Sequence, residues 1–172
     1  MPGKQYTGGD WTYLYIIGGN ICQNVEKDSE GARRRDWETK DGKKGTKYEL
    51  VYRSWEAMIK SLTFKDTDYG TQLNVEMEDA TLTLPTDSRY FSDFAKKVKS
   101  LDLTKPVEFA PYDWEPEPGK RSIGINLLQG GKKVTNYYWN DVDSTWVHGI
   151  PQPVGETKYF KSDDWKRKRY YY

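Results

Sequence analysis

Residues 55–101 read WEAMIKSLTFKDTDYGTQLNVEMEDATLTLPTDSRYFSDFAKKVKSL and contain the clearest structural pattern in the chain. Apolar and polar residues alternate from Leu73 to Met77 and again from Ala80 to Leu84, which is the period of half-buried strands. The apolar parity changes between Trp55–Ile59 and Leu62–Phe64, which indicates a long strand with a bulge. This part of the chain therefore predicts three consecutive strands.

A helix is expected after these strands, over residues 88–101. Its apolar residues recur at the three-and-four spacing of one helix face, while lysines occupy the other side. Thr86, Asp87 or Ser88 can cap its first turn. The apolar stripe consists of Phe91, Phe94, Ala95, Val98 and Leu101.

Two hairpins are expected on either side of this region. Trp11–Ile17 and Ile21–Val25 are joined by Gly-Gly-Asn, a tight-turn sequence. After the helix, residues 106–114 have strand composition, and Ser122–Gln129 and Lys132–Trp139 flank a Gly-Gly turn. Glycine accepts the positive φ that such turns require.

A polar, basic stretch from Glu26 to Lys47 separates the first hairpin from a strand-like segment that begins at Tyr48. It has few apolar side chains to bury, so we expect a long exposed loop or a mobile β-arm. Residues 31–47 contain seven basic and three acidic side chains, and residues 158–172 contain six basic and two acidic side chains. Residues 62–90 are acidic, with two basic side chains against six.

Length and composition predict one soluble domain over residues 1–172, with a core at about 48–140, an N-terminal hairpin and basic arm at 11–47, and a C-terminal extension at 141–172. The net charge is +1 and aromatic residues make up 15% of the chain. Cys22 is the only cysteine, so an intrachain disulfide is impossible, which fits a reducing cytoplasm. No apolar run approaches a membrane span and no signal peptide is visible.

Several segments resemble phage-type single-stranded DNA-binding proteins. They are SLTFKDTDYG at 61–70 with LNVEMED at 73–79, the strand at 106–112, and GKRSIGI at 119–125. The resemblance implies the oligonucleotide/oligosaccharide-binding (OB) fold, a mainly β, five-stranded Greek-key barrel with one α-helix between strands 3 and 4. It also implies a protein that coats or protects single-stranded DNA during phage replication or recombination, in the host cytoplasm, with replication or recombination proteins as partners. An acidic C-terminal tail that recruits such partners is not expected, because residues 166–172 are KRKRYYY.

Binding without sequence preference needs cations for phosphates and rings for base stacking. In the basic segment we predict Arg33, Arg34, Arg35, Trp37, Lys40, Lys43 and Lys44 as nucleic-acid-binding residues. In the barrel we predict Tyr52, Trp55, Tyr69, Trp114, Tyr137 and Trp139 as stacking rings.

No enzyme activity, metal or cofactor is expected. His148 is the only histidine and Cys22 the only thiol, so neither a zinc cluster nor a Ser/His/Asp relay can be assembled. Asp36, Glu38 and Lys40 have the spacing of a nuclease site, but we expect them in a loop, which would not hold a metal rigidly. The alternative function is a carbohydrate- or protein-binding β-module. The sequence leaves open the oligomeric state and the choice between DNA and RNA.

Overall fold

The computed structural model describes residues 11–148 of the chain. This range is mainly β, with one α-helix that a 3₁₀ turn extends. The elements are β1 (Thr12–Ile17), β2 (Asn20–Val25), β3 (Arg33–Glu38), β4 (Lys44–Tyr52), β5 (Trp55–Ala57), β6 (Ile59–Thr67), β7 (Gly70–Met77), β8 (Ala80–Pro85), α1 (Arg89–Lys97), the 3₁₀ turn η1 (Val98–Ser100), β9 (Val107–Trp114), β10 (Ser122–Gln129), β11 (Lys132–Lys133), β12 (Trp139–Asn140) and β13 (Thr145–Trp146).

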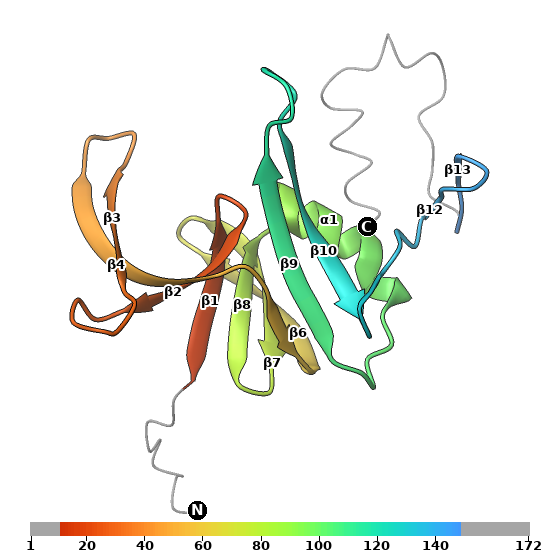
Figure 1. Ribbon diagram of the computed structural model, residues 1–172, viewed down its shortest axis with the longest axis horizontal. Coiled ribbons are helices and arrows are strands. Elements are labelled where there is room, and N and C mark those ends of the chain that lie inside the picture. The colour runs from red at the N-terminus through yellow and green to blue at the C-terminus, as the bar shows by residue number, and fades with distance from the viewer. Residues whose placement is uncertain (1–10, 149–172) are drawn as a thin grey trace, which may run out of the picture.

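Two sheets form the body of the molecule (Figure 1). The seven-stranded sheet has the order β3-β4-β2-β1-β8-β7-β6, and the four-stranded sheet has the order β11-β10-β9-β5. All neighbours in them are antiparallel except β1 and β8. β5 and β6 follow one another directly, so this run of chain links the sheets, and its pairing shifts between Ile59 and Ser61. The bulge expected from the change in apolar parity is therefore present.

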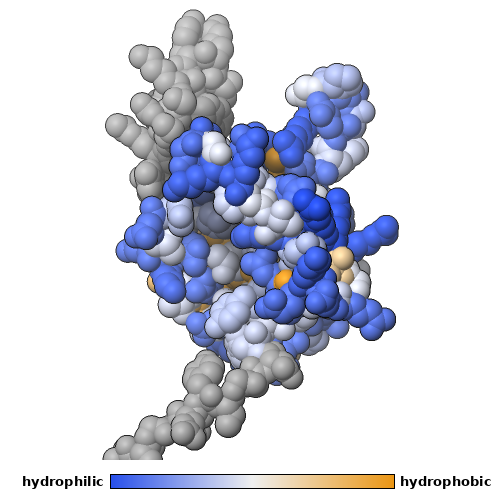
Figure 2. Space-filling model, turned by 90° about the vertical axis from the view of Figure 1, so that its left-hand side faces the viewer, coloured by the Kyte–Doolittle hydropathy of each residue, from blue (hydrophilic) through white to orange (hydrophobic). Residues whose placement is uncertain are grey.

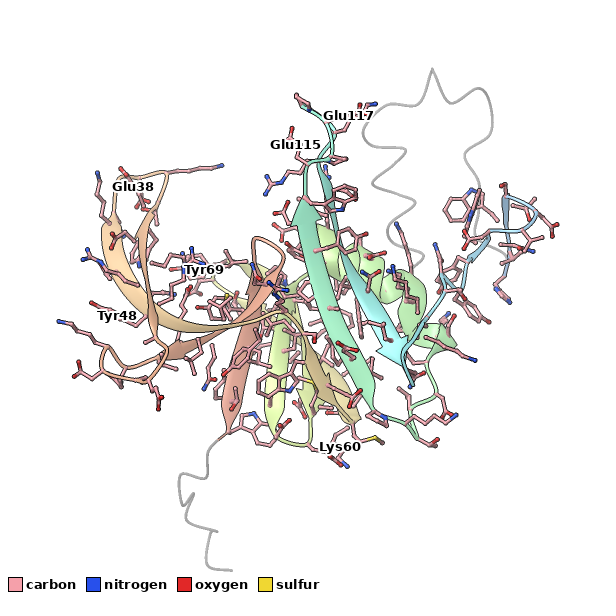
Figure 3. The ribbon with its side chains drawn as sticks, in the orientation of Figure 1. Glu38, Tyr48, Lys60, Tyr69, Glu115 and Glu117 are labelled. Atoms are coloured by element: carbon pink, nitrogen blue, oxygen red, sulfur yellow. The ribbon has the colours of Figure 1, made fainter. Side chains whose placement is uncertain are left out.

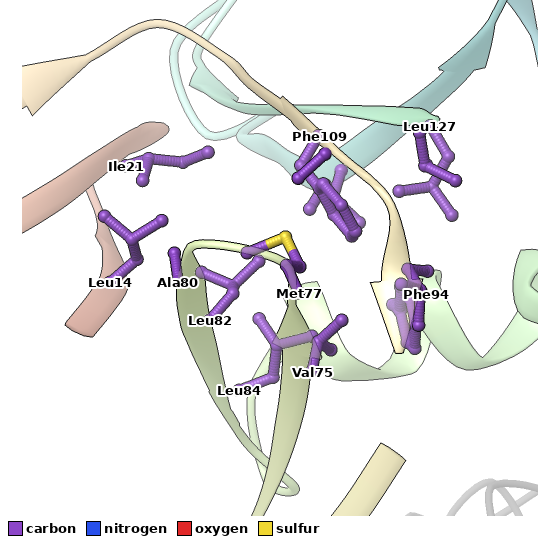
Figure 4. Packing of buried hydrophobic residues seen from close by; sticks show 14 of the residues in the cluster. Leu14, Ile21, Val75, Met77, Ala80, Leu82, Leu84, Phe94, Phe109 and Leu127 are labelled. Atoms are coloured by element: carbon purple, nitrogen blue, oxygen red, sulfur yellow. The ribbon is translucent and has the colours of Figure 1, made fainter. Parts of the chain in front are cut away.

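The core lies between the sheets and α1 (Figure 4). Alternate residues of β1, β7 and β8 point into it, as the period of two predicts. The four-stranded sheet contributes Phe109, Ile125 and Leu127, and α1 contributes Phe94, which stacks on Phe109. Leu73, Val75 and Met77, together with Leu82 and Leu84, are buried as the sequence predicted.

Helix α1 is fixed to β10 by a polar clamp. Of the three predicted capping residues, Ser88 is the N-cap, and its side chain accepts the Phe91 N–H. The Asp93 carboxylate accepts both the Ile125 N–H, at 2.8 Å, and the Lys97 ammonium group. Lys97 also donates to the Ile125 carbonyl, so the helix and the strand satisfy each other's polar groups.

The predicted N-terminal hairpin is present as β1 and β2, and its turn packs against β9. Gly18 and Gly19 both have positive φ, at 54° and 74°. The Gly19 N–H donates to the Tyr90 hydroxyl at 3.0 Å. A Cβ on Gly19 would lie 2.5 Å from the Asp113 nitrogen, so glycine allows the turn to approach β9 this closely.

The predicted fold class is confirmed at the level of a mainly β protein with one α-helix, which lies between β8 and β9. The predicted five-stranded Greek-key barrel is not confirmed, because residues 11–148 form a seven-stranded sheet and no closed barrel, and β8 pairs with β1 and not with β10. The predicted strand over Lys132–Trp139 is also too long. β11 ends at Lys133, and Trp139 belongs to a separate two-stranded sheet with β13.

Candidate functional site

The face of the seven-stranded sheet that points away from the core is here called the outer face. The strand registers assign its residues, because directly opposed residues share a face. Its charged side chains are Arg33, Arg35, Lys47, Lys65, Glu49 and Glu76. Cations thus outnumber carboxylates on this face by two, and three of the four cations lie on β3 and β4.

The basic segment is a β-arm and not a loop. β3 pairs with β4 from Arg33 opposite Glu49 to Glu38 opposite Lys44. The arm extends from the rest of the seven-stranded sheet (Figure 1), and the surface on this side is predominantly hydrophilic (Figure 2). Of the two structures that the sequence allowed, the β-arm is the one that forms.

Trp37 lies on the outer face of the arm, directly opposite Gly45. A Cβ on Gly45 would overlap the Trp37 indole, so the ring lies across the backbone of β4. The ring is half-buried and keeps part of its surface accessible. The pairing of Trp37 with a glycine therefore supports a flat aromatic platform beside the cations of β3.

Arg35 neutralises a buried carboxylate. The Glu49 side chain is 3% exposed. It forms an ion pair with the Arg35 guanidinium at 2.6 Å and accepts a hydrogen bond from the Tyr15 hydroxyl at 2.5 Å. Burial by itself raises the pKa of Glu49, but the hydrogen bonds from Arg35 and Tyr15 outweigh it and hold that pKa below its usual value. Burial, followed by the bond to Glu49, raises the pKa of Tyr15. The charge of Arg35 is therefore largely committed to the fold.

The other predicted cations of the arm divide into paired and unpaired groups. Arg34 pairs with Asp36 on the opposite face, Lys43 pairs with Asp41, and Lys44 pairs with Glu38. Among residues 11–148, Arg33, Lys40 and Lys47 form no ion pair. Arg33 and Lys47 are exposed and share the outer face, so they are the side chains best placed to meet an anion.

Two aromatic residues of the outer face were not among the predicted site residues. Tyr13 is 66% exposed, and Trp11, which is 42% exposed, donates its indole N–H to Thr81 at 2.9 Å. Ile17 and Val51 add exposed apolar surface. The signal was present in the sequence, because Trp11, Tyr13 and Tyr15 alternate with a period of two and therefore share one face.

Tyr52 and Trp55 lie on the core side instead. Their rings meet edge to face at 5.1 Å, and both pack against the core. The Tyr52 hydroxyl donates to Gln23, and the Trp55 indole nitrogen is buried. These two predicted stacking rings contribute to packing and not to an open surface.

Tyr69 and Trp114 are exposed but belong to elements other than the β-arm. Tyr69 is fully exposed in the turn between β6 and β7, and Trp114 is 57% exposed at the end of β9. Glu115 and Glu117 project from the loop after Trp114 (Figure 3), and Glu117 pairs with Lys120 of the same loop.

Tyr137 and Trp139 belong to the C-terminal part of the described chain. Tyr137 stacks on His148 with ring centroids 3.9 Å apart, and Trp139 packs edge to face on Trp146. The Tyr137 N–H donates to the Lys96 carbonyl, which attaches this segment to α1. The structure therefore does not place these rings with those of the outer face.

The nuclease-like spacing at Asp36, Glu38 and Lys40 was expected to lie in a loop, but Asp36 and Glu38 lie on β3. Both carboxylates are engaged, the first by Arg34 and Thr46 and the second by Lys44. No group of three or more potential metal-ligating side chains occurs within residues 11–148.

Comparison with known proteins found no matching family model, no matching curated protein and no matching solved structure. No helix in the described part of the chain is long and apolar enough to cross a membrane.

Proposed function

We propose that this chain is a non-catalytic protein that binds single-stranded DNA across the outer face of the seven-stranded sheet. One observation carries the proposal: Arg33 and Lys47 lie on the same face of the β-arm as the Trp37 ring. Tyr13 on β1 and Trp11, the residue before β1, add exposed rings to the same outer face. Single strands are held by this combination, since cations contact phosphates and rings stack on bases.

The fold supports the same function at a coarser level. β5–β6, β7, β8, β9 and β10, with α1 between β8 and β9, follow the element order of an OB core. In this interpretation β1 of the β1–β2 hairpin pairs with the edge of β8 that β10 would occupy if the barrel were closed. OB-type proteins that coat single strands during replication or recombination bind with little sequence preference, and we propose that role, in a phage context, for this chain.

The test is fluorescence quenching by oligo(dT) at two salt concentrations. The double variant Arg33→Ala with Lys47→Ala should weaken binding and reduce the slope of log K against log salt by about 1.4, because each phosphate contact on a single strand contributes about 0.7. Trp37→Ala should weaken binding by about 1–3 kcal/mol, the range for one stacked base.

Arg34→Ala is the matched control for Arg33→Ala. It removes the same charge from the neighbouring position, but on the opposite face of β3 and from a pair with Asp36. Equal effects of the two single variants on affinity and salt slope would contradict the proposal. Binding of a neutral oligosaccharide that does not respond to salt would assign the face to the carbohydrate-binding alternative.

A further inference from the structure

Strand β6 forms one edge of the seven-stranded sheet and is unusually open. Seven of its nine residues are exposed, and its far side has no partner strand among residues 11–148 after the bulge at Ile59. An edge strand of this kind presents unpaired backbone N–H and C=O groups and can template pairing with another chain.

Strand β6 carries two lysines and one aspartate, but it also has exposed apolar side chains between the lysines. Leu62 is 41% exposed and Phe64 is 63% exposed, and the Phe64 ring meets Phe91 of α1 with centroids 6.2 Å apart. The opposite edge of the same sheet, β3, has the sequence RRRDWE, and such charge discourages pairing. The two edges therefore differ, and only β6 has an exposed apolar pair.

We propose that β6 pairs antiparallel with β6 of a second copy of this chain, centred on Thr63. The sequence of β6 is complementary to itself in that register. Thr63 would oppose Thr63, Leu62 would oppose Phe64, Ser61 would oppose Lys65, and Lys60 would oppose Asp66. Two apolar cross-strand pairs thus flank the central Thr63 pair, and no like charges face each other. At both ends Lys60, which contacts Glu78 within one copy, would also meet Asp66 of the other copy.

The size of this interface determines how the dimer should behave. One strand pair with four apolar side chains lies at the small end of specific interfaces, which commonly bury about 1,200–2,000 Å² in total. Self-association should therefore depend on protein concentration and reverse on dilution.

Sedimentation velocity of the full chain over a range of concentrations provides the first test. The apparent mass should rise toward that of a dimer, and Phe64→Lys should abolish the rise without loss of folding as measured by circular dichroism. Leu103→Lys is the matched control, because Leu103 is 54% exposed in the loop after η1, and it should leave the rise unchanged. A monomer at every concentration, or a dimer that Phe64→Lys does not weaken, would overturn the proposal.

Cross-linking tests the register without relying on charge. In the proposed pairing the two Thr63 Cα atoms lie about 4.5–5.5 Å apart, within reach of a disulfide. Thr63→Cys should give a covalent dimer on oxidation. Lys65→Cys should not, because its two copies would be separated by four residues, or roughly 13 Å. Cys22 is buried and is the only other thiol, so it provides no competing cross-link. Equal cross-linking of the two variants would overturn the register.

Discussion

Glu49 is a buried carboxylate whose charge is stabilised by two partners from different strands, Arg35 and Tyr15. Because its pKa in the folded protein is below the usual 4.5, the stabilisation is complete above that value and is lost as the pH falls toward the folded-state pKa. We expect the urea concentration at the unfolding midpoint of the wild type to decrease when the pH is lowered below about 4.5. In Glu49→Gln this midpoint should depend less steeply on pH.

Glu38→Gln is the control for this titration. Glu38 lies on the same arm, but its pair with Lys44 is exposed on both sides, and exposed pairs contribute about 0–1 kcal/mol. Its urea midpoints should follow those of the wild type from neutral to acid pH. If Glu49→Gln also followed them, the buried pair would not be the source of the acid sensitivity.

Arg33 and Arg35 are two positions apart on the same face, yet their replacement should have different consequences. Arg35→Ala leaves Glu49 buried without its cation, and we expect a loss of about 2–3 kcal/mol of unfolding free energy, reduced from the full buried-pair value because Arg35 is partly exposed. Arg33→Ala should change stability by less than about 0.5 kcal/mol. Urea unfolding at neutral pH compares them, and equal losses would show that the Glu49 charge does not depend on Arg35.

The β1–β2 turn packs against β9. Substitutions at its two glycines distinguish the cost of backbone strain from the cost of a steric collision with β9. Gly18→Ala meets only the unfavourable positive φ, since nothing lies within 4 Å of its Cβ position. We expect it to cost about 1–2 kcal/mol. Gly19→Ala adds a collision with the Tyr112–Asp113 backbone and should destabilise clearly more. Thermal unfolding compares the two variants, and equal melting temperatures would mean that the turn does not pack tightly against β9.

The elements that the sequence predicted well are those with a strong local signal. The period of two in β7 and β8, the three-and-four spacing in α1 and the glycine turn between β1 and β2 all appear in the structure. The arm was ambiguous because its strands bury little, so no apolar alternation identifies them. The strand after Gly131 was overestimated because aromatic composition favours a strand, whereas Tyr137 and Tyr138 pack beside α1 and η1.

Taken as a whole molecule, a dimer through β6 would have its two outer faces on the same side. A two-fold axis between antiparallel neighbours of one sheet is perpendicular to that sheet, so it does not exchange the faces. If both proposals hold, an oligo(dT) long enough to cross both copies should bind the wild type more tightly than one of half that length, through effective concentration.

Phe64→Lys should remove this advantage of the longer oligonucleotide while leaving the affinity for the shorter one unchanged, and Leu103→Lys should retain it. Titrations with both lengths provide the comparison. An advantage of the same size in Phe64→Lys and the wild type would show that the longer strand does not bridge two copies through β6. A loss of binding to both lengths would instead place Phe64 in the binding surface.

Sequence alone was enough to predict a mainly β chain, the helix between strands, the first hairpin and the concentration of positive charge between residues 31 and 47. These features depend on local periodicity and composition, which neighbouring residues establish among themselves. Only the tertiary structure decided that β8 pairs with β1 and that Tyr52 and Trp55 pack against the core. It also decided that Arg35 pairs with Glu49, while Arg33 and Lys47 lie on the same outer face as Trp37 without an ion pair to any residue that the structure describes. Those outcomes depend on which strands meet and in which register, and contacts between residues far apart in the chain determine both.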